Sequence, residues 1–170
     1  GIPSLRTVKD GDIVSVDITA LLNGYQGDAA RTFPVGNVSP QNLALIAAAK
    51  SAFEAGLEYA KAGNKVGDIS SAVQLYSEIN GYGVVRALTG HGIGRKMHEP
   101  PEVPNFGKRN TGAPLKNGLC ICIEPMITSG DWRVYIERDG WTVRTADGSN
   151  AAHYENTVII TDGVPEILTV

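Results

Sequence analysis

A glutamate that directly follows a run of apolar residues is the first position in this sequence that could do chemistry. The run, residues 119–123, is typical of a buried strand, and Glu124 and Pro125 end it. A carboxylate buried without a partner costs roughly several kcal/mol, and it takes up a proton instead. Glu124 should therefore face a cation or have a raised pKa, and both outcomes are typical of a functional site.

Two further acids, Asp17 and Asp28, flank Asn23-Gly24, a strong signal for a two-residue hairpin turn. A hairpin closed at that turn makes the two acids diagonal neighbours on one face. Their Cβ atoms would lie about 5.5 to 8 Å apart, close enough to hold one or two cations between the carboxylates. The alternatives are a solvated face for both acids, and a bulge at Gly27 that would shift the register.

A fourth acid and a histidine extend this set. Glu155 lies in the last long β-prone stretch, where an exposed or edge position is the alternative to a site. His91 lies among glycines in residues 90–94, after an expected strand, and glycines let the backbone approach a ligand closely. A dinucleotide-binding loop does not fit, because Arg95 stands where its third glycine is needed. His98 could be a ligand, an acid or a bystander.

Four carboxylates and one imidazole supply mostly oxygen donors. Such a set suits a dinuclear site for Mn, Fe, Co or Zn better than a closed structural zinc site, and all four metals are candidates. Two cations about 3.5 to 4 Å apart can share a hydroxide and polarise the bond under attack, so amide hydrolysis would fit. Cys120 and Cys122 are expected to stay reduced and to pack as small core side chains.

The elements that must position these residues predict an α+β fold. A hairpin is expected over residues 12–22 and 25–35, a long helix over residues 41–62, and a shorter helix from Asp68 to Asn80. The region 89–118 is rich in Gly and Pro and is expected to form loops. Further strands are expected at residues 84–88, 119–127, 132–137, 141–145, 152–161 and 166–170. One compact domain, with the helices on one sheet face, accommodates this order.

The composition of the chain argues against some classes of function. With 18 acidic and 15 basic residues, the net charge of −3 does not favour nucleic acid or an anionic membrane surface as a partner. No apolar run reaches the roughly 20 residues that span a bilayer, and the first residues do not resemble a signal peptide. A cytoplasmic protein is expected.

Taken together, the motifs resemble the type I methionine aminopeptidases of the pita-bread (creatinase/aminopeptidase-like) fold. The motifs are Asp17-Ile18-Thr19, Gly27-Asp28-Ala29-Ala30-Arg31-Thr32, Thr89-Gly90-His91-Gly92-Ile93-Gly94, Met97-His98-Glu99-Pro100-Pro101, Ile123-Glu124-Pro125-Met126, Asp139-Gly140-Trp141-Thr142-Val143-Arg144-Thr145 and His153-Tyr154-Glu155-Asn156-Thr157. They follow the family's order along essentially the whole chain. The resemblance implies a curved, mostly antiparallel sheet with helices on its outer face.

The resemblance also implies roles for individual residues. The ligands of two divalent metal ions (Co, Mn, Fe or Zn) would be Asp17, Asp28, His91, Glu124 and Glu155. Of these, Asp28 and Glu155 would bridge the ions. The catalytic residues would be Glu124, which handles the proton of the attacking water, and His98, which steadies the substrate carbonyl. The residues near the substrate would be Met97, His98 and Trp141. For the first and last of these, core packing is the alternative.

The implied reaction is removal of the initiator methionine from nascent proteins by attack of a metal-activated hydroxide. The N-terminal Met of peptides and nascent chains would be the substrate, and the ribosome is a candidate partner. In the family, Gly-Ile-Pro is preceded by a substrate-contacting His and an N-terminal segment, whereas here Gly1 comes first. Residues 1–170 are therefore expected to be a single catalytic metallopeptidase domain truncated at its N-terminus, to which a missing segment or a second chain would contribute.

Two other functions are compatible with these motifs. A proline-directed peptidase of the same fold would share the ligand set. A catalytically impaired fragment that binds metal or a protein partner would also fit, because part of the substrate pocket lies outside these residues. Retention of all five inferred ligands favours an enzyme over the second alternative.

Overall fold

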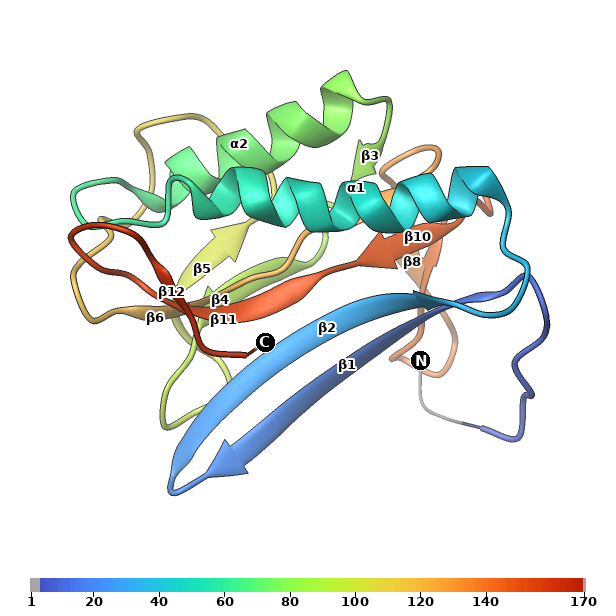
Figure 1. Ribbon diagram of the computed structural model, residues 1–170, viewed down its shortest axis with the longest axis horizontal. Coiled ribbons are helices and arrows are strands. Elements are labelled where there is room, and N and C mark those ends of the chain that lie inside the picture. Colours follow the sequence, from blue (N-terminus) through green and yellow to red (C-terminus); the bar gives the residue numbers. More distant parts are fainter. Residues whose placement is uncertain (1–3, 170) are drawn as a thin grey trace.

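The computed structural model describes residues 4–169, which form an α+β arrangement as expected (Figure 1). The helices are α1 (Pro40–Leu57) and α2 (Val66–Ile79). The strands are β1 (Ile13–Leu22), β2 (Tyr25–Pro34), β3 (Gly83–Val84), β4 (Thr89–Gly92), β5 (Glu99–Pro104), β6 (Cys120–Ile123), β7 (Met126–Thr128), β8 (Val134–Ile136), β9 (Val143–Thr145), β10 (Ala151–His153), β11 (Glu155–Ile159) and β12 (Glu166–Ile167).

The main sheet of the described chain has seven strands in the order β1-β2-β11-β6-β4-β5, and β12 pairs with β11. Its neighbours run antiparallel throughout. A smaller sheet, β10-β7-β3, and the β8–β9 hairpin complete the strands. Both helices lie side by side over the same face of the main sheet (Figure 1). The expected placement of the helices on one face is confirmed.

The register of the β1–β2 hairpin is the one that the sequence predicts. Asn23 has φ 51° and Gly24 has φ 84°, the left-handed conformations that a tight hairpin turn of this kind requires. Asp17 pairs with Ala30, and Asp28 pairs with Thr19, so that the two aspartates are diagonal neighbours. The pairing is continuous through Gly27, and the bulge considered there is absent from the described hairpin.

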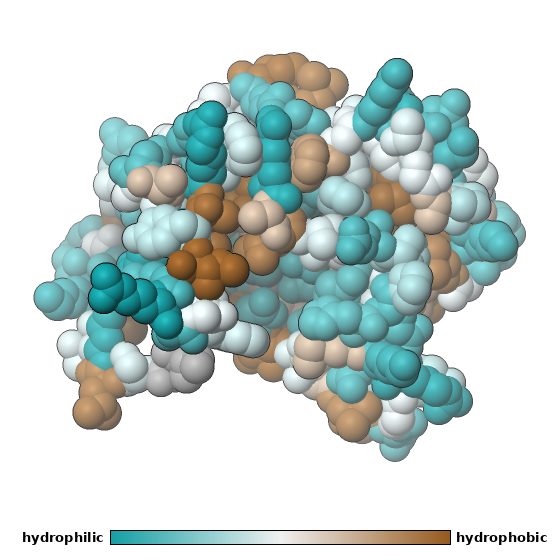
Figure 2. Space-filling model, turned by 180° about the vertical axis from the view of Figure 1, so that it is seen from behind, coloured by the Kyte–Doolittle hydropathy of each residue, from teal (hydrophilic) through white to brown (hydrophobic). Residues whose placement is uncertain are grey.

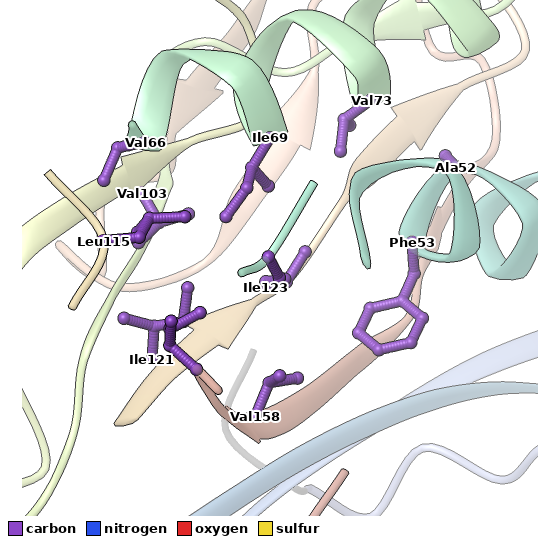
Figure 3. Close-up of a cluster of buried hydrophobic side chains, with 12 residues drawn as sticks. Ala52, Phe53, Val66, Ile69, Val73, Val103, Leu115, Ile121, Ile123 and Val158 are labelled. Carbon is purple, nitrogen blue, oxygen red and sulfur yellow. The ribbon is translucent and has the colours of Figure 1, made fainter. Parts of the chain in front are cut away.

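The main core lies between the helices and the sheet (Figure 3). Phe53 comes from α1, and Ile69 and Val73 come from α2. They pack against Ile121 of β6 and Val158 of β11, and all five are at most 2% exposed. Because successive residues of a strand point to opposite faces, burying Ile121 and Val158 under the helices leaves the alternate residues for the other face of the sheet.

Substitution of Gly56 by alanine should destabilise this core. A Cβ at position 56 would lie 2.8 Å from Cγ2 of Val73 and 3.2 Å from Cγ2 of Ile69. Both neighbours are β-branched and fully buried, so they cannot rotate away, and the clash should outweigh the gain in helix propensity. We expect the free energy of unfolding to fall by about 1 to 3 kcal/mol in a urea titration. Lys50→Ala, an exposed change on the same helix, should alter it by less than about 0.5 kcal/mol.

The long helix ends earlier than the sequence predicts. α1 stops at Leu57, whereas helix was expected up to residue 62. The reason is a tertiary contact, because Lys61 forms an isolated parallel bridge with Thr161, and the N–H of Ala62 donates to the Thr161 carbonyl at 2.8 Å. Pairing with a segment a hundred residues further along therefore replaces the last helical turn.

The expected loop region 89–118 contains two strands of the main sheet, so that prediction is wrong in part. β5 is built from Glu99–Pro104, which includes three prolines. A proline removes a ladder donor, but β5 is the last strand of the sheet and can accommodate it at the edge. The strand expected at residues 84–88 is shorter, because only Gly83–Val84 pairs with β7.

The outer surface is mostly hydrophilic when the molecule is viewed from behind, with apolar side chains in small groups (Figure 2). Several exposed apolar residues belong to β1, among them Ile18 and Leu22, because no helix covers that strand. Neither helix within residues 4–169 is long and apolar enough to cross a membrane.

Candidate metal centre

One face of the main sheet collects the acids that the sequence singles out. Asp17 pairs with Ala30 across the hairpin, and Ala30 pairs with Glu155 of β11. Residues paired across antiparallel strands point to the same face, and Asp28 lies two residues from Ala30 on β2. Asp17, Asp28 and Glu155 therefore share one face. Val158, three residues beyond Glu155, points to the opposite face under the helices.

The end of β6 brings the fourth acid to this face. Ile121 and Ile123 are buried in the core, so Cys122 and Glu124 point the other way. Pro125 has no N–H to continue the ladder, and β6 ends before Glu124. Glu124 is buried, and its side chain is only 11% exposed.

His91 approaches the acids from β4, not from the loop in which the sequence predicts it. Its Nδ1 lies 2.9 Å from the Gly92 carbonyl, so Nδ1–H donates and Nε2 keeps its lone pair. Nε2 lies 3.4 Å from Oε1 of Glu124 and 3.9 Å from Oδ2 of Asp28. A glycine precedes His91 for a steric reason: a Cβ at Gly90 would lie 2.4 Å from the Cys122 carbonyl oxygen and 3.2 Å from Cγ of Glu124.

A second imidazole, His153, lies in the site, although the sequence motifs predict no role for it. Its Nε2 is 3.8 Å from Oε2 of Glu124 and 3.8 Å from Oε2 of Glu155. One signal could have indicated it, because His153 stands two residues before Glu155 in a β-prone stretch, and alternate residues of a strand share a face.

Arg31 fixes the position of Glu155 from the neighbouring strand. Its Nη1 donates to the backbone carbonyl of Glu155, and its Nη2 donates to Oδ1 of Asn156 at 2.7 Å. The guanidinium also stacks on the ring of Tyr154, 4.1 Å from the centroid. These contacts hold the backbone of β11 against β2 at the level of the acids.

Burial and mutual repulsion raise the pKa of three acids of the site, Glu124, Glu155 and Asp17. Loss of water raises the pKa of Glu124 far above its ordinary value, and the charge of Glu155 raises it further. Burial likewise raises the pKa of Glu155, followed by the charges of Asp28 and Asp17. The pKa of Asp17 is raised by partial loss of water and by Asp28. The raised pKa expected of Glu124 is therefore present in the metal-free protein.

Burial has the opposite effect on the two imidazoles. It lowers the pKa of His91, and it lowers the pKa of His153 to about 4. Both rings are neutral at pH 7 and keep a lone pair available to a cation. The metal-free centre thus combines acids that resist ionisation with imidazoles that resist protonation.

Several buried polar atoms of the centre have no hydrogen-bond partner among the described residues, which is uncommon in a folded protein. They are Oδ1 of Asp28, Nε2 of His153 and Oε1 of Glu155. The residues that carry these atoms belong to two groups, and within each group one possible ligand atom per residue lies within 4.8 Å of the others. The first group is Asp28, His91, Cys122 and Glu155, and the second is Asp17, His153 and Glu155. Divalent cations would satisfy these atoms and compensate the buried negative charge, so the donor set fits a metal centre.

Cys122 has the properties of a core residue, as expected. It is fully buried, its Sγ lies 3.7 Å from Oγ1 of Thr157, and burial strongly raises the pKa of the thiol. Metals bind the thiolate, so a thiol that resists ionisation is a poor ligand. Cys120 and Cys122 are both free, which confirms the reduced state.

The residues expected near the substrate differ in their exposure to solvent and in their contact with the site. The ring of His98 meets the ring of His91 edge-on, with 4.4 Å between centroids, so the structure brings His98 to the centre. Met97 is 41% exposed beside it. Trp141 is 67% exposed between β8 and β9 and is not drawn into a buried pocket. Core packing, the alternative for Met97 and Trp141, is wrong for both.

Comparison with known proteins identifies the class. The pattern of metallopeptidase family M24 matches residues 1–162. The chain belongs to this family of metal-dependent peptidases, and its expected pita-bread fold is confirmed by solved structures. The methionine aminopeptidase structure from Rickettsia prowazekii has a TM-score of 0.98 at 42% identity, over 100% of this chain and 69% of that one. The prolidase structure from Pyrococcus furiosus has a TM-score of 0.77 at 28% identity, over 98% and 44%.

The curated relatives with high identity are methionine aminopeptidases. The chain is 54% identical to the "Methionine aminopeptidase" of Clostridium acetobutylicum, over 99% of this chain and 68% of that protein. It is 46% identical to "Methionine aminopeptidase 1" of Bacillus subtilis, again over 99% and 68%. The chain therefore spans about two thirds of the length of these relatives.

Proposed function

We propose that this chain is an aminopeptidase that removes N-terminal methionine from peptides and nascent proteins with the help of two divalent metal ions. The observation that carries the proposal is the meeting of ligand-type side chains from β1, β2, β4, β11 and the end of β6 on one sheet face. The names of the relatives supply the substrate class, because 54% identity over nearly the whole chain favours the same substrate.

The ligands that we propose are the four acids and the imidazole inferred from the sequence: Asp17, Asp28, His91, Glu124 and Glu155. Asp28 and Glu155 lie centrally on the face and are assigned as bridging ligands. When bound, divalent cations such as Co, Mn, Fe or Zn would supply Lewis-acid chemistry, which lowers the pKa of a water molecule and polarises a carbonyl.

Residues of the chain would carry out proton transfer, stabilise the developing charge and bind the substrate. Glu124 accepts the proton that the attacking water loses and returns it to the amine nitrogen that leaves. His98 donates a hydrogen bond to the substrate carbonyl oxygen, where negative charge develops. Met97, one residue before His98, and Trp141 are assigned to contact the methionine side chain, and both are exposed.

Substitution of His98 by alanine should separate catalysis from metal binding. We expect kcat for a Met-Ala-Ser peptide to fall by about 10² to 10³-fold, because a donor to the developing charge is lost. Calorimetry should show unchanged uptake of Co(II), because His98 is not among the assigned ligands. A variant that lost metal affinity in proportion to activity would contradict this role for His98.

The substrate itself tests the proposed function. We expect the chain loaded with Co(II) or Mn(II) to release methionine from Met-Ala-Ser, followed by chromatography, and to leave an Ala-Pro-Ser peptide intact. Cleavage of the second peptide alone would favour a proline-directed peptidase. Metal uptake without cleavage of either peptide would favour a binding fragment.

The proposal also includes the domain organisation of the enzyme, its partner and its location in the cell. Residues 1–170 would act as one catalytic domain, and nascent chains as substrates would make the ribosome a partner and the cytoplasm the place of action. Co-sedimentation with ribosomes that carry nascent chains tests this association, and recovery of all the protein in the supernatant would count against it.

A further inference from the structure

His153 is held in place by the strand that carries Asp28. Its backbone N–H donates to Oγ1 of Thr32 at 2.8 Å, and Thr32 Oγ1 lies 2.9 Å from its carbonyl oxygen. It also pairs with Met126 across β10 and β7. Both backbone polar groups are thus fixed, and the ring, only 13% exposed, has little freedom to leave the centre.

The free nitrogen of this ring faces carboxylate oxygens at a distance that no hydrogen bond explains. Nε2 is buried without a hydrogen-bond partner in the described chain, and it lies 3.8 Å from one oxygen each of Glu124 and Glu155. A hydrogen bond would need about 3 Å. Two atoms bound to one ion at 2.0 to 2.2 Å lie about 3 to 4.2 Å apart, so the observed spacing matches donors that share a cation.

The two imidazoles face different oxygens of the same carboxylate. Nε2 of His91 is 3.4 Å from Oε1 of Glu124, whereas Nε2 of His153 is 3.8 Å from Oε2. His91 groups with Asp28 and Glu155, and His153 groups with Asp17 and Glu155. Glu155 is shared by the two groups, and Glu124 lies between the two rings.

We propose that His153 is a sixth ligand of the metal centre, so that each of the two ion positions has one imidazole. The inference rests on the proposed metal centre and adds to it a residue that the sequence resemblance leaves without a role. The second position would then be formed by Asp17, His153 and Glu155, together with Glu124 and the bridging Asp28.

A second imidazole changes which metals the centre prefers. Carboxylate and water ligands suit Mn, whereas imidazole favours Fe, Co and Zn. With His153 as a ligand, the second position should discriminate against Mn(II). His153→Gln should weaken binding of one of two Co(II) equivalents by about tenfold or more, and should weaken Mn(II) binding less. Isothermal titration of the unaltered chain and of His153→Gln with each metal measures this difference.

The direct test is a metal–nitrogen bond observed by NMR. The chain has only three histidines, so labelling histidine with ¹⁵N gives three ring systems to follow during titration with ¹¹³Cd(II). We expect one-bond coupling between cadmium and Nε2 of both His91 and His153, and none at His98. The variants His98→Gln and His91→Gln assign the three rings by subtraction even if a change at His153 prevents folding.

The outcomes distinguish the two proposals. Coupling at His91 alone, with two equivalents of cadmium bound, would overturn the role of His153 and leave the metal centre intact. Coupling at neither ring would contradict the metal centre itself, and the role of His153 with it. If Asp17→Asn changes neither the cadmium coupling at His153 nor the affinity for cadmium, the assignment of Asp17 to the same ion is overturned.

Discussion

Replacement of Glu155 by glutamine is expected to reduce metal-dependent release of methionine by about 10³-fold or more, a loss of about 4 kcal/mol in transition-state stabilisation. Glu155 is the one residue present in both groups of donors, so the neutral amide weakens both ion positions at once. The same change should stabilise the metal-free protein at pH 7.5 by about 1 to 3 kcal/mol. It removes a carboxylate that is 2% exposed and repelled by its neighbours, while keeping the shape of the side chain.

The opposite signs of these two effects separate a metal-centre residue from a structural one. Activity is measured with saturating Co(II), and stability by urea denaturation in the presence of a chelator. Glu166→Gln is the matched control, because Glu166 is an exposed acid on the adjoining strand β12, and it should change neither quantity. Wild-type turnover of Glu155→Gln, or a loss of stability of its metal-free form, would refute this account of Glu155.

Metal-free stability should fall as the pH rises above about 6.5, and bound metal should abolish the fall. The folded-state pKa values of Glu124 and Glu155 are raised above 4.5, so the folded chain holds protons that the unfolded chain has lost, and the free energy of unfolding decreases with pH. Below about pH 6.5 the lowered pKa values of His91 and His153 act in the opposite direction, because there the unfolded chain binds more protons. Between pH 5 and 6.5 the effects of the acids and of the histidines on the free energy of unfolding nearly cancel. Above pH 6.5 only the effect of the acids remains, and stability decreases.

The expected loss of metal-free stability between pH 6.5 and 8 is roughly 2 to 4 kcal/mol, from one or two groups at about 1.4 kcal/mol per pH unit. Urea titrations across this range, with a chelator or with saturating Mn(II), measure it. With metal bound, the acids are ionised in the folded state too, so the slope should vanish and metal binding should release protons. Equal slopes with and without metal would show that these acids do not hold the ions.

Local chemistry in the sequence was enough to predict the part of the site built on the hairpin. Asn23-Gly24 specifies a tight turn, the turn specifies the register, and the register makes Asp17 and Asp28 neighbours. Glu124 was predicted for a similar reason, because an apolar strand that ends at Glu-Pro leaves a carboxylate at the edge of the core.

Features that depend on distant contacts were not predictable in this way. Residues 58–62 favour helix locally, but the chain turns at residues 58–59 and Lys61 pairs with Thr161 instead. β5 contains prolines that a central strand would exclude, and only its place at the sheet edge explains it. His153 required knowledge that β10 and β11 bring it beside Glu124, a residue from another part of the chain. The exposed position of Trp141 likewise depends on how the β8–β9 hairpin is oriented.

The most direct test of the central claim is an anomalous-difference map from crystals of this chain grown with Co(II), measured on both sides of the cobalt absorption edge. Two peaks within coordinating distance of Glu155, one of them also near Asp28 and His91, are the predicted result, because Glu155 is the residue that the two groups of donors share. Cobalt found only at surface positions, with no peak between β2, β6 and β11, would contradict the claim that this sheet face is a metal centre.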